Sequence, residues 1–249
     1  MHRISLTGIE GLPEITPGAD LAALIVAAVG SMGLSVEAGD VLVVAQKVVS
    51  KAEGCFVELD EVTASPLARA WGQRHGKDPR IIEVILRESR RIVRMDRGLL
   101  IVETLHGFVC ANAGVDSSNV PTGRVLTLPR DPDASARRLR DRLGAAFGVP
   151  VGVVISDTFG RPWREGIVNV AIGVAGLRPL ADYRGERDHF GRTLHTTLVA
   201  TADEIASAAE LVMGKTRGIP VVAVRGVLGL AGDGSGTELL RPADLDLFR

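Results

Sequence analysis

The sequence has few cysteines, no long hydrophobic run and almost no net charge. Its two cysteines, Cys55 and Cys110, are too few for a disulfide framework and lack metal-ligand spacing, so we expect two buried or half-buried thiols in a reducing compartment. The formal charge of -1 gives no general reason to expect nucleic acid or an anionic membrane as a partner, since both are bound by basic faces. No apolar run approaches the roughly 18 residues that span a bilayer, and the N-terminus lacks a signal segment. We therefore expect a cytoplasmic protein.

Lysine is scarce as well. Among the 29 basic residues the only lysines are Lys47, Lys51, Lys77 and Lys215, so most of the positive charge is arginine. Each lysine position therefore merits separate attention.

Several familiar catalytic motifs are absent. The chain has no G-x-S-x-G nucleophile elbow, no GxGxxG after its first strand, and no histidine pair with zinc-ligand spacing. The triplet "GKT" at 214–216 resembles the end of a P-loop, but Ala209 stands where that pattern needs glycine, and the triplet ends a helix instead of beginning one. Two interpretations stay open: a glycine C-cap followed by a lysine that complements the helix dipole, or a phosphate-binding turn of another design.

The pattern of hydrophobic residues indicates helices and strands in irregular order. With 46% hydrophobic residues, the 249-residue chain can bury a sizeable core in one large domain or two small ones. Helical periodicity covers residues 20–29, 133–147 and 201–213. Strand-like runs cover 41–45, 221–224 and two segments of 98–114, and 78–94 indicates a helix followed by a strand. This order favours an α+β fold with an irregular mixed sheet over a doubly wound sheet.

The three clearest helices carry capping signals. Asp20 is the expected N-cap of the first, and Asp133 of the second. Thr201 and Glu204 have the spacing of a capping box at the start of the third, and Gly214 is expected to end it.

Two polar segments follow apolar ones and form a candidate site. Asp116 and Asn119 lie in a loop of small residues, and Asp157 and Thr158 follow an apolar run that we expect to end there. Each segment alone is also typical of a capped turn. Together they favour a site, because carboxylates from separate strand ends can converge on a divalent cation that also binds phosphates.

A set of basic residues could neutralise phosphate charge beside these carboxylates, although arginines in surface turns are more often solvated. The set comprises Lys47, Lys51, Arg161, Arg164 and Lys215.

Long ordered segments across the chain resemble the coenzyme F420-0:L-glutamate ligase family. They include "QKVVSKAEG" (46–54), "ETLHGFVCANAGVDSSNV" (103–120) and "ISDTFGRPWREG" (155–166). The other segments are 11–15, 78–94, 169–185, 202–215 and 241–249.

The resemblance implies a GTP-dependent ligase that adds L-glutamate to coenzyme F420-0, and then further γ-linked glutamate, through an acyl phosphate. It implies GTP as co-substrate, two Mg²⁺ or Mn²⁺ ions, and K⁺ as an additional cation. It also implies a two-lobed subunit in an intertwined homodimer. Residues 1–249 would form a single catalytic domain, divisible into two α+β subdomains, without the C-terminal flavin-binding half of the fused relatives. The alternatives are a related amide ligase with another carboxylate acceptor, or a non-catalytic nucleotide-binding module.

The same resemblance assigns roles to individual residues. Asp116, Asp157 and Lys51 would be catalytic, and Asp116, Asp157 and Thr158 would hold the metal. The nucleotide would contact Leu12, Pro13, Glu14, Ile15, Gln46, Lys47, Lys51, Asn119, Met213, Gly214, Lys215 and Thr216. Gln46 departs from the Ser or Thr that relatives commonly carry. Glu210 is a weaker candidate, since helical spacing places it off the apolar face of its helix.

Overall fold

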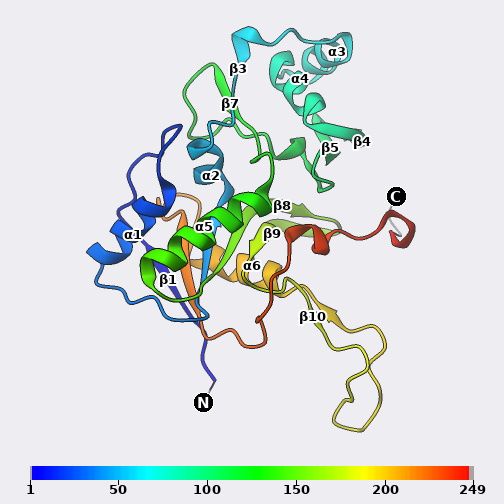
Figure 1. Ribbon diagram of the computed structural model, residues 1–249. Helices are drawn as coiled ribbons and strands as arrows, with labels where there is room; N and C mark the ends of the chain where they lie inside the picture. The colour runs from blue at the N-terminus through cyan, green and yellow to red at the C-terminus, as the bar shows by residue number, and fades with distance from the viewer. Residues whose placement is uncertain (1, 247–249) are drawn as a thin grey trace.

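A five-stranded mixed sheet forms the centre of the computed structural model, which describes residues 2–246 (Figure 1). Residue 1 and the last three positions of the segment 241–249 lie outside the described residues. The strand order is β1-β12-β2-β8-β9, with β2 and β8 parallel and the other pairs antiparallel. This sheet confirms the predicted α+β class. Its strands are β1 Ser5–Ile9, β2 Val41–Ala45, β8 Gly152–Arg161, β9 Arg164–Ala175 and β12 Val221–Arg225.

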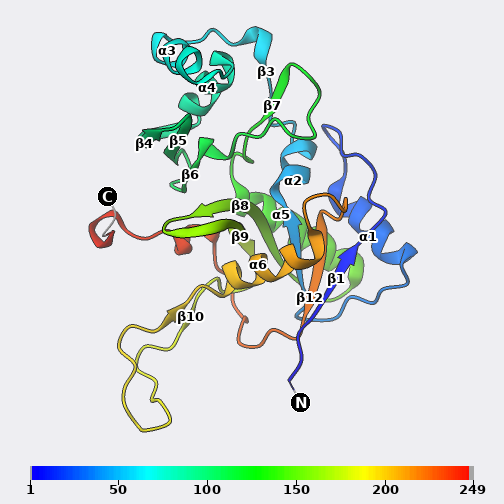
Figure 2. The same cartoon turned by 180° about the vertical axis from the view of Figure 1, so that it is seen from behind.

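Helices cover both faces of this sheet (Figures 1 and 2). Leu42 and Val44 of β2 point toward the face covered by α1, α2 and α5, whereas Val41 and Val43 point toward α6, because successive side chains of a strand alternate. The expected uninterrupted apolar strand at 41–45 is therefore a strand buried on both sides. The helices are α1 Leu21–Ser31, α2 Gln46–Ala52, α5 Pro132–Phe147 and α6 Thr201–Met213.

Residues 56–126 form a group of elements between α2 and α5 in the chain. Figure 1 shows them standing beyond one end of the sheet, where they surround hydrophobic clusters of their own. A two-stranded ribbon of β3 and β7 leads to a three-stranded antiparallel sheet with order β4-β5-β6. The elements are β3 Phe56–Glu58, η1 Leu59–Glu61, α3 Pro66–His75, α4 Pro79–Arg87, β4 Ser89–Asp96, β5 Leu99–Thr104, β6 Val109–Ala111, η2 Asn112–Gly114 and β7 Arg124–Leu126.

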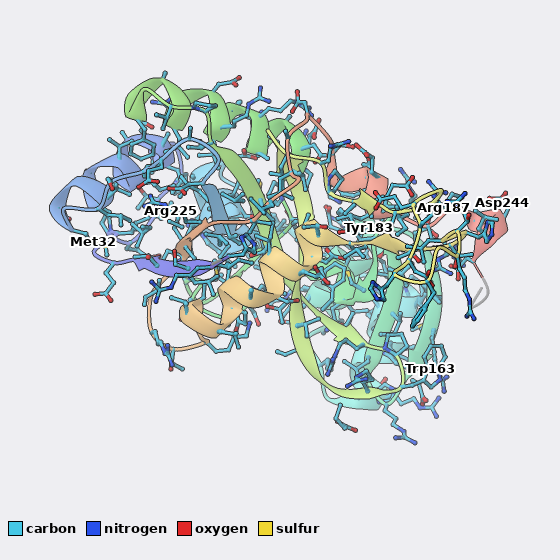
Figure 3. The ribbon with its side chains drawn as sticks, turned by 90° about the horizontal axis from the view of Figure 1, so that it is seen from below. Met32, Trp163, Tyr183, Arg187, Arg225 and Asp244 are labelled. Carbon is cyan, nitrogen blue, oxygen red and sulfur yellow. The ribbon has the colours of Figure 1, made fainter. Side chains whose placement is uncertain are left out.

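A long arm leaves the sheet after β9. Strands β10 Ala181–Asp182 and β11 Leu198–Val199 pair at its base, and residues 183–197 extend from them, as Tyr183 and Arg187 mark in Figure 3. Phe190 on this arm is 83% exposed. Two short 3-10 helices, η3 Gly236–Leu239 and η4 Ala243–Leu245, follow β12. Within residues 2–246, no helix has both the length and the apolar character that crossing a membrane requires.

Several local predictions are confirmed. The Asp20 side chain accepts a hydrogen bond from the Ala23 N–H and caps α1. Residues 78–94 form α4 followed by β4, and the chain turns at Gly107 between β5 and β6 with a φ of 98°. Both cysteines are free thiols, with Cys110 buried and Cys55 half-buried.

Two capping predictions are wrong. The N-cap of α5 is Asp131, whose carboxylate accepts from the Ala134 N–H at 2.8 Å. Asp133 instead turns inward, where one carboxylate oxygen accepts from Val174 N–H at 2.8 Å and Gly236 N–H at 2.7 Å. Helix α6 begins after Ala200 without a side-chain cap, so Thr201 and Glu204 form no capping box. Tertiary contacts decide which of two nearby carboxylates serves as the cap.

Replacing these two aspartates separately should give unequal losses of stability. Asp131→Ala removes an exposed cap and should cost about 1 kcal/mol. Asp133→Ala leaves two backbone N–H groups in the interior without their acceptor and should cost about 3 kcal/mol. Urea denaturation of both variants measures the difference. Equal losses would contradict the assigned roles.

Candidate active site

A cavity of about 760 Å³ opens at the edge of the sheet where β2 ends and its parallel pairing with β8 stops. Residues that follow parallel strands meet at one edge of a sheet, and the segment before the antiparallel β12 reaches the same edge. Every residue that the family resemblance assigned to a role lines this cavity. These residues are Leu12, Pro13, Glu14, Ile15, Gln46, Lys47, Lys51, Asp116, Asn119, Asp157, Thr158, Met213, Gly214, Lys215 and Thr216. Their individual roles stay predictions.

Asp157 and Thr158 reach the cavity from inside a strand. The expectation that the strand ends at Asp157 is wrong, because β8 continues to Arg161 and pairs Asp157 with Val170 and Thr158 with Asn169 of β9. Strand β2, however, ends opposite Ser156. The two side chains therefore stand on a paired stretch of the β8–β9 hairpin, between two register shifts and beyond the end of β2.

The Asp157 carboxyl lies in a site that resists its ionisation. Burial raises its pKa to about 6, and the negative charge of Asp116 acts in the same direction. The Thr158 N–H, Lys215 and Lys47 only partly oppose this shift. Such a carboxylate is stabilised by an additional cation.

Asp116 both shapes its loop and faces the cavity. One carboxylate oxygen accepts from Ser118 N–H at 2.6 Å, and the other pairs with the Lys47 ammonium at 2.7 Å. Burial opposes ionisation, but Lys47 and the Ser118 N–H prevail and hold the pKa of Asp116 below its ordinary value. Asn119 adopts a positive φ of 53°, which asparagine tolerates well. The turn interpretation of this loop is therefore confirmed, and Asp116 and Asn119 also line the cavity.

Three of the four lysines of the chain line this one cavity. The Lys51 ammonium is buried and forms an ion pair with Glu14. Lys47 pairs with Asp116, and Lys215 donates to the Thr158 hydroxyl at 2.8 Å. Because lysine is otherwise nearly absent from the protein, this convergence indicates a site for an anionic ligand such as phosphate.

The cavity also contains polar residues that the sequence analysis did not predict or gave only as weak candidates. Glu210 lines it and pairs with Lys215 at 2.8 Å, although it lies off the apolar face of α6. Asn169 is 4% exposed and accepts a hydrogen bond from the Thr158 hydroxyl at 2.9 Å. The Ser156 hydroxyl is buried without a hydrogen-bond partner. The one sequence signal for Asn169 was its position as a polar residue at the start of the apolar run "NVAIGVAG".

Two members of the predicted basic set do not reach the cavity. Arg161 and Arg164 lie at the turn between β8 and β9, where the Arg161 guanidinium donates to the backbone oxygen of Glu165. Neither residue lines the cavity. Gln46 does line it, and its side-chain oxygen accepts from the Ser50 hydroxyl at 2.8 Å.

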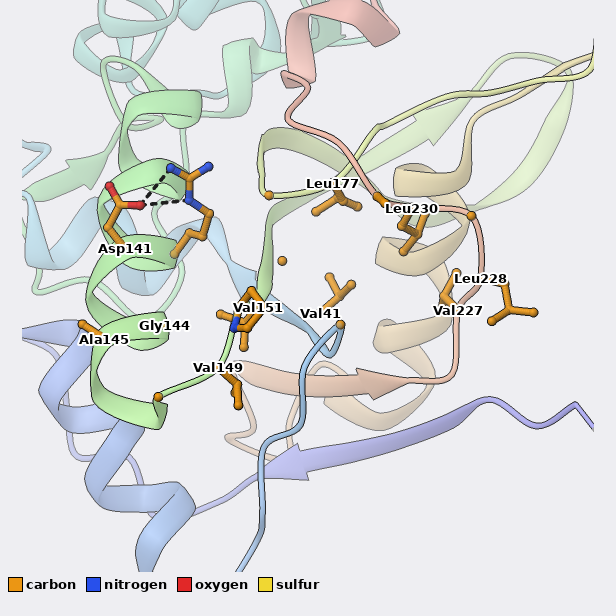
Figure 4. Close-up of a pocket in the computed structure, with 18 residues that line it drawn as sticks. Val41, Asp141, Gly144, Ala145, Val149, Val151, Leu177, Val227, Leu228 and Leu230 are labelled. Atoms are coloured by element: carbon orange, nitrogen blue, oxygen red, sulfur yellow. Dashed lines mark hydrogen bonds and ion pairs between the residues drawn. The ribbon is translucent and has the colours of Figure 1, made fainter.

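A second cavity, of about 950 Å³, lies at the opposite end of β2 and β8 (Figure 4). Its walls are glycines and apolar side chains such as Val41 and Leu177. Its charged residues are already paired, since Arg140 contacts Asp141 at 2.8 Å and Asp233 at 2.9 Å. It therefore lacks the unsatisfied charge that distinguishes the cavity beside Asp157.

The donor set beside Asp157 fits a hard divalent cation. Asp116, Asp157 and Thr158 offer oxygen ligands only, the type that Mg²⁺ and Mn²⁺ prefer. No group of three or more His, Cys, Asp or Glu side chains suited to a metal occurs within residues 2–246. A cation held here would therefore complete its coordination with water and with phosphate oxygens, as Mg²⁺ commonly does.

The fold and cavity define an α+β protein whose sheet edge carries a cavity lined by both carboxylates and lysines. A model of the family described as F420-0:Gamma-glutamyl ligase matches residues 10–226. The chain therefore belongs to this family. It is 51% identical to the Coenzyme F420:L-glutamate ligase of Methanothermobacter thermautotrophicus over 99% of both chains. It is 50% identical to that of Methanopyrus kandleri over 97% of both, and 47% identical to that of Methanocaldococcus jannaschii over 86% of both.

Asp157→Asn should stabilise the fold at neutral pH. Since the folded state raises the pKa of Asp157 from 3.8 to about 6, its ionisation above that pH costs free energy that a neutral amide avoids. We expect the free energy of unfolding to rise by about 1 kcal/mol at pH 7.5, less than the full shift implies, because water reaches part of the side chain.

The sign of the pH dependence follows from the raised pKa. The wild type loses stability relative to the variant as the pH rises from about 4 to 6, so the difference in the free energy of unfolding between Asp157→Asn and the wild type should shrink toward pH 4. Urea denaturation at pH 7.5 and at pH 4 measures this difference, with the exposed Asp141→Asn as the control. A difference that is absent at pH 7.5, or equally large at pH 4, contradicts the raised pKa.

Proposed function

We propose that this protein is a GTP-dependent ligase of coenzyme F420 biosynthesis, acting in the cytoplasm. It adds L-glutamate to coenzyme F420-0 and then further glutamate in γ-linkage. The observation that carries the proposal is the convergence of all predicted nucleotide and metal residues on one cavity. Family membership and full-length relatives that bear the name Coenzyme F420:L-glutamate ligase support the choice of substrates.

The chemistry explains why the site has charge but no nucleophile motif. A carboxylate does not condense with an amine at neutral pH, so an oxygen of the F420-0 carboxylate first attacks the γ-phosphorus of GTP, and GDP leaves. The glutamate amine then attacks the carbonyl carbon of this acyl phosphate, inorganic phosphate leaves, and the amine releases its proton. Phosphoryl transfer of this kind depends on alignment and charge neutralisation.

The residues of the cavity divide between these tasks. Lys51 and Lys47 neutralise phosphate charge, and Asn119 with the segments 12–15 and 213–216 holds the nucleotide. Asp116, Asp157 and Thr158 hold Mg²⁺ or Mn²⁺, with K⁺ as an additional cation. A divalent ion there supplies Lewis-acid polarisation of the transferred phosphoryl group.

A mass assay tests the reaction directly. Purified protein is incubated with F420-0, L-glutamate, GTP and MgCl₂, and the coenzyme is followed by mass spectrometry. We expect one glutamyl increment and then a second, together with GDP and phosphate. No added mass, under conditions where GTP binding is verified, would refute the ligase.

Substitutions in the two cavities should separate a chemical role from a structural one. Asp116→Asn and Asp157→Asn remove metal-facing charge and should lower kcat by at least about 100-fold while the proteins stay folded. Asp141→Asn, in the cavity of Figure 4, should leave kcat within about twofold. Wild-type turnover in either metal-facing variant would contradict its assigned role.

We further propose that two-lobed subunits form an intertwined homodimer. The support is two exposed aromatic residues on projecting segments. Phe190 on the 183–197 arm is 83% exposed. Trp163 at the β8–β9 turn, labelled in Figure 3, is 79% exposed. Sedimentation should give a mass of twice 26.3 kDa. The double change Phe190→Asp and Trp163→Asp should shift it toward the monomer. A monomeric wild type at micromolar concentration would refute the dimer.

A further inference from the structure

We infer that Asn169 is a positioning residue for cation binding: its amide oxygen takes the proton of the Thr158 hydroxyl, so that this hydroxyl turns only lone pairs toward the cavity. The inference rests on the proposed function, which assigns Thr158 as a cation ligand. It adds a residue to which the family resemblance gave no role and which acts through Thr158.

The orientation of the Asn169 amide follows from its neighbours. Its Oδ1 lies 2.9 Å from Thr158 Oγ1 and 3.4 Å from the Lys215 Nζ. An ammonium group can only donate, so the amide atom that faces both of these groups is the oxygen. The amide nitrogen faces the Met213 sulfur, a weak acceptor, at 4.0 Å. Asn169 is therefore an acceptor toward Thr158.

The position of the Thr158 proton follows from the same contacts. Lys215 donates to Thr158 Oγ1 at 2.8 Å, so the hydroxyl proton does not point toward this ammonium. A hydroxyl has one proton and two lone pairs, and the proton lies in the bond to Asn169. A cation requires lone pairs and is repelled by a proton. Asn169 thus gives the hydroxyl the orientation that a cation ligand needs, as outer partners of metal ligands generally do.

The strand register brings Asn169 to this place. The pairing of β8 with β9 shifts by one residue at Ile172, which is the additional residue of β9. Without this shift Val170 would stand opposite Thr158, and a valine side chain has no atom that accepts a proton. Bulges of this kind often re-aim side chains beside functional sites.

Asn169 is held on its main chain as well as on its side chain. The Ser207 hydroxyl of α6 donates to the Asn169 backbone oxygen at 2.7 Å, and Asn169 is 4% exposed. Because burial keeps water from competing for the amide, its bond to Thr158 holds the hydroxyl in one orientation.

A double-mutant cycle on Mn²⁺ affinity tests the inference without relying on turnover. Each protein is saturated with a non-hydrolysable GTP analogue and titrated with Mn²⁺, and electron paramagnetic resonance of the free ion gives the affinity. Thr158→Val removes the hydroxyl and identifies the Mn²⁺ binding that depends on it. Asn169→Leu removes the acceptor and should weaken that binding about 10-fold. When Thr158→Val is already present, Asn169→Leu should change the affinity by less than about twofold, because no hydroxyl is left to orient.

Two further variants separate the amide from general damage to β9. Ser207→Ala removes the hydrogen bond to the Asn169 backbone oxygen but leaves the amide, and should keep the Mn²⁺ affinity within about twofold of the wild type. Asn169→Ala removes the acceptor with a smaller side chain, and carries the test if leucine prevents folding. Circular dichroism and binding of a fluorescent GTP analogue verify that each variant is folded and takes the nucleotide.

The possible outcomes distinguish this inference from the proposals on which it rests. Unchanged Mn²⁺ affinity in the folded Asn169 variants would overturn it, as would equal losses with and without the Thr158 hydroxyl, or an equal loss in Ser207→Ala. Wild-type Mn²⁺ affinity in Thr158→Val would overturn both the inference and the assignment of Thr158 as a ligand. The glutamylation assay of the wild type decides the ligase proposal independently of these affinities.

Discussion

The parallel pairing of β2 with β8 determines where the polar groups of the cavity lie. Residues 41–45 pair with 152–156, so the segment after Ala45 and the continuation of β8, which stays paired with β9, begin side by side. Lys47 and Asp157 are thereby brought to one cavity although about a hundred residues separate them in the chain. The antiparallel β12 starts at the same edge and brings Lys215 there from a third direction. Were β8 shifted by one residue, Asp157 would point to the opposite face.

Charge balance follows from this geometry. The cavity collects four carboxylates and three lysines. Lys47 pairs with Asp116 and Lys51 with Glu14 between distant segments, whereas Lys215 pairs with Glu210 at the end of its own helix. Asp157 has the least compensation, which is why burial can raise its pKa so far. A folded protein tolerates such a group when a ligand supplies the missing charge on binding, and stability is then given up for function.

The sequence predicted several of the helices and strands, and the family resemblance selected residues that all line one cavity, but neither revealed the hydrogen-bond partners of these residues. Apolar runs and glycine stops identified β2, β12 and the end of α6, because these depend on local composition. The choice of Asp131 over Asp133 as a cap depends on Val174 and Gly236, which no local pattern reveals. Asn169 was missed for a similar reason: its place opposite Thr158 is set by hairpin register. The periodicity of hydrophobic residues along the chain does not reveal which distant segments pair, so these contacts could not be predicted from it.

The same register gives the site its rigidity. Side chains on loops move more than those on strands, and a binding site requires side chains that hold their geometry closely. Here Asp157 and Thr158 stand on a paired strand, and the Thr158 hydroxyl is fixed by Asn169 directly across the hairpin. Its proton is committed to that bond, so its remaining lone pairs face Lys215 and the cavity. A sequence change at Asn169 would therefore free the Thr158 hydroxyl to rotate and so alter the cavity through a residue that lies across the hairpin from it.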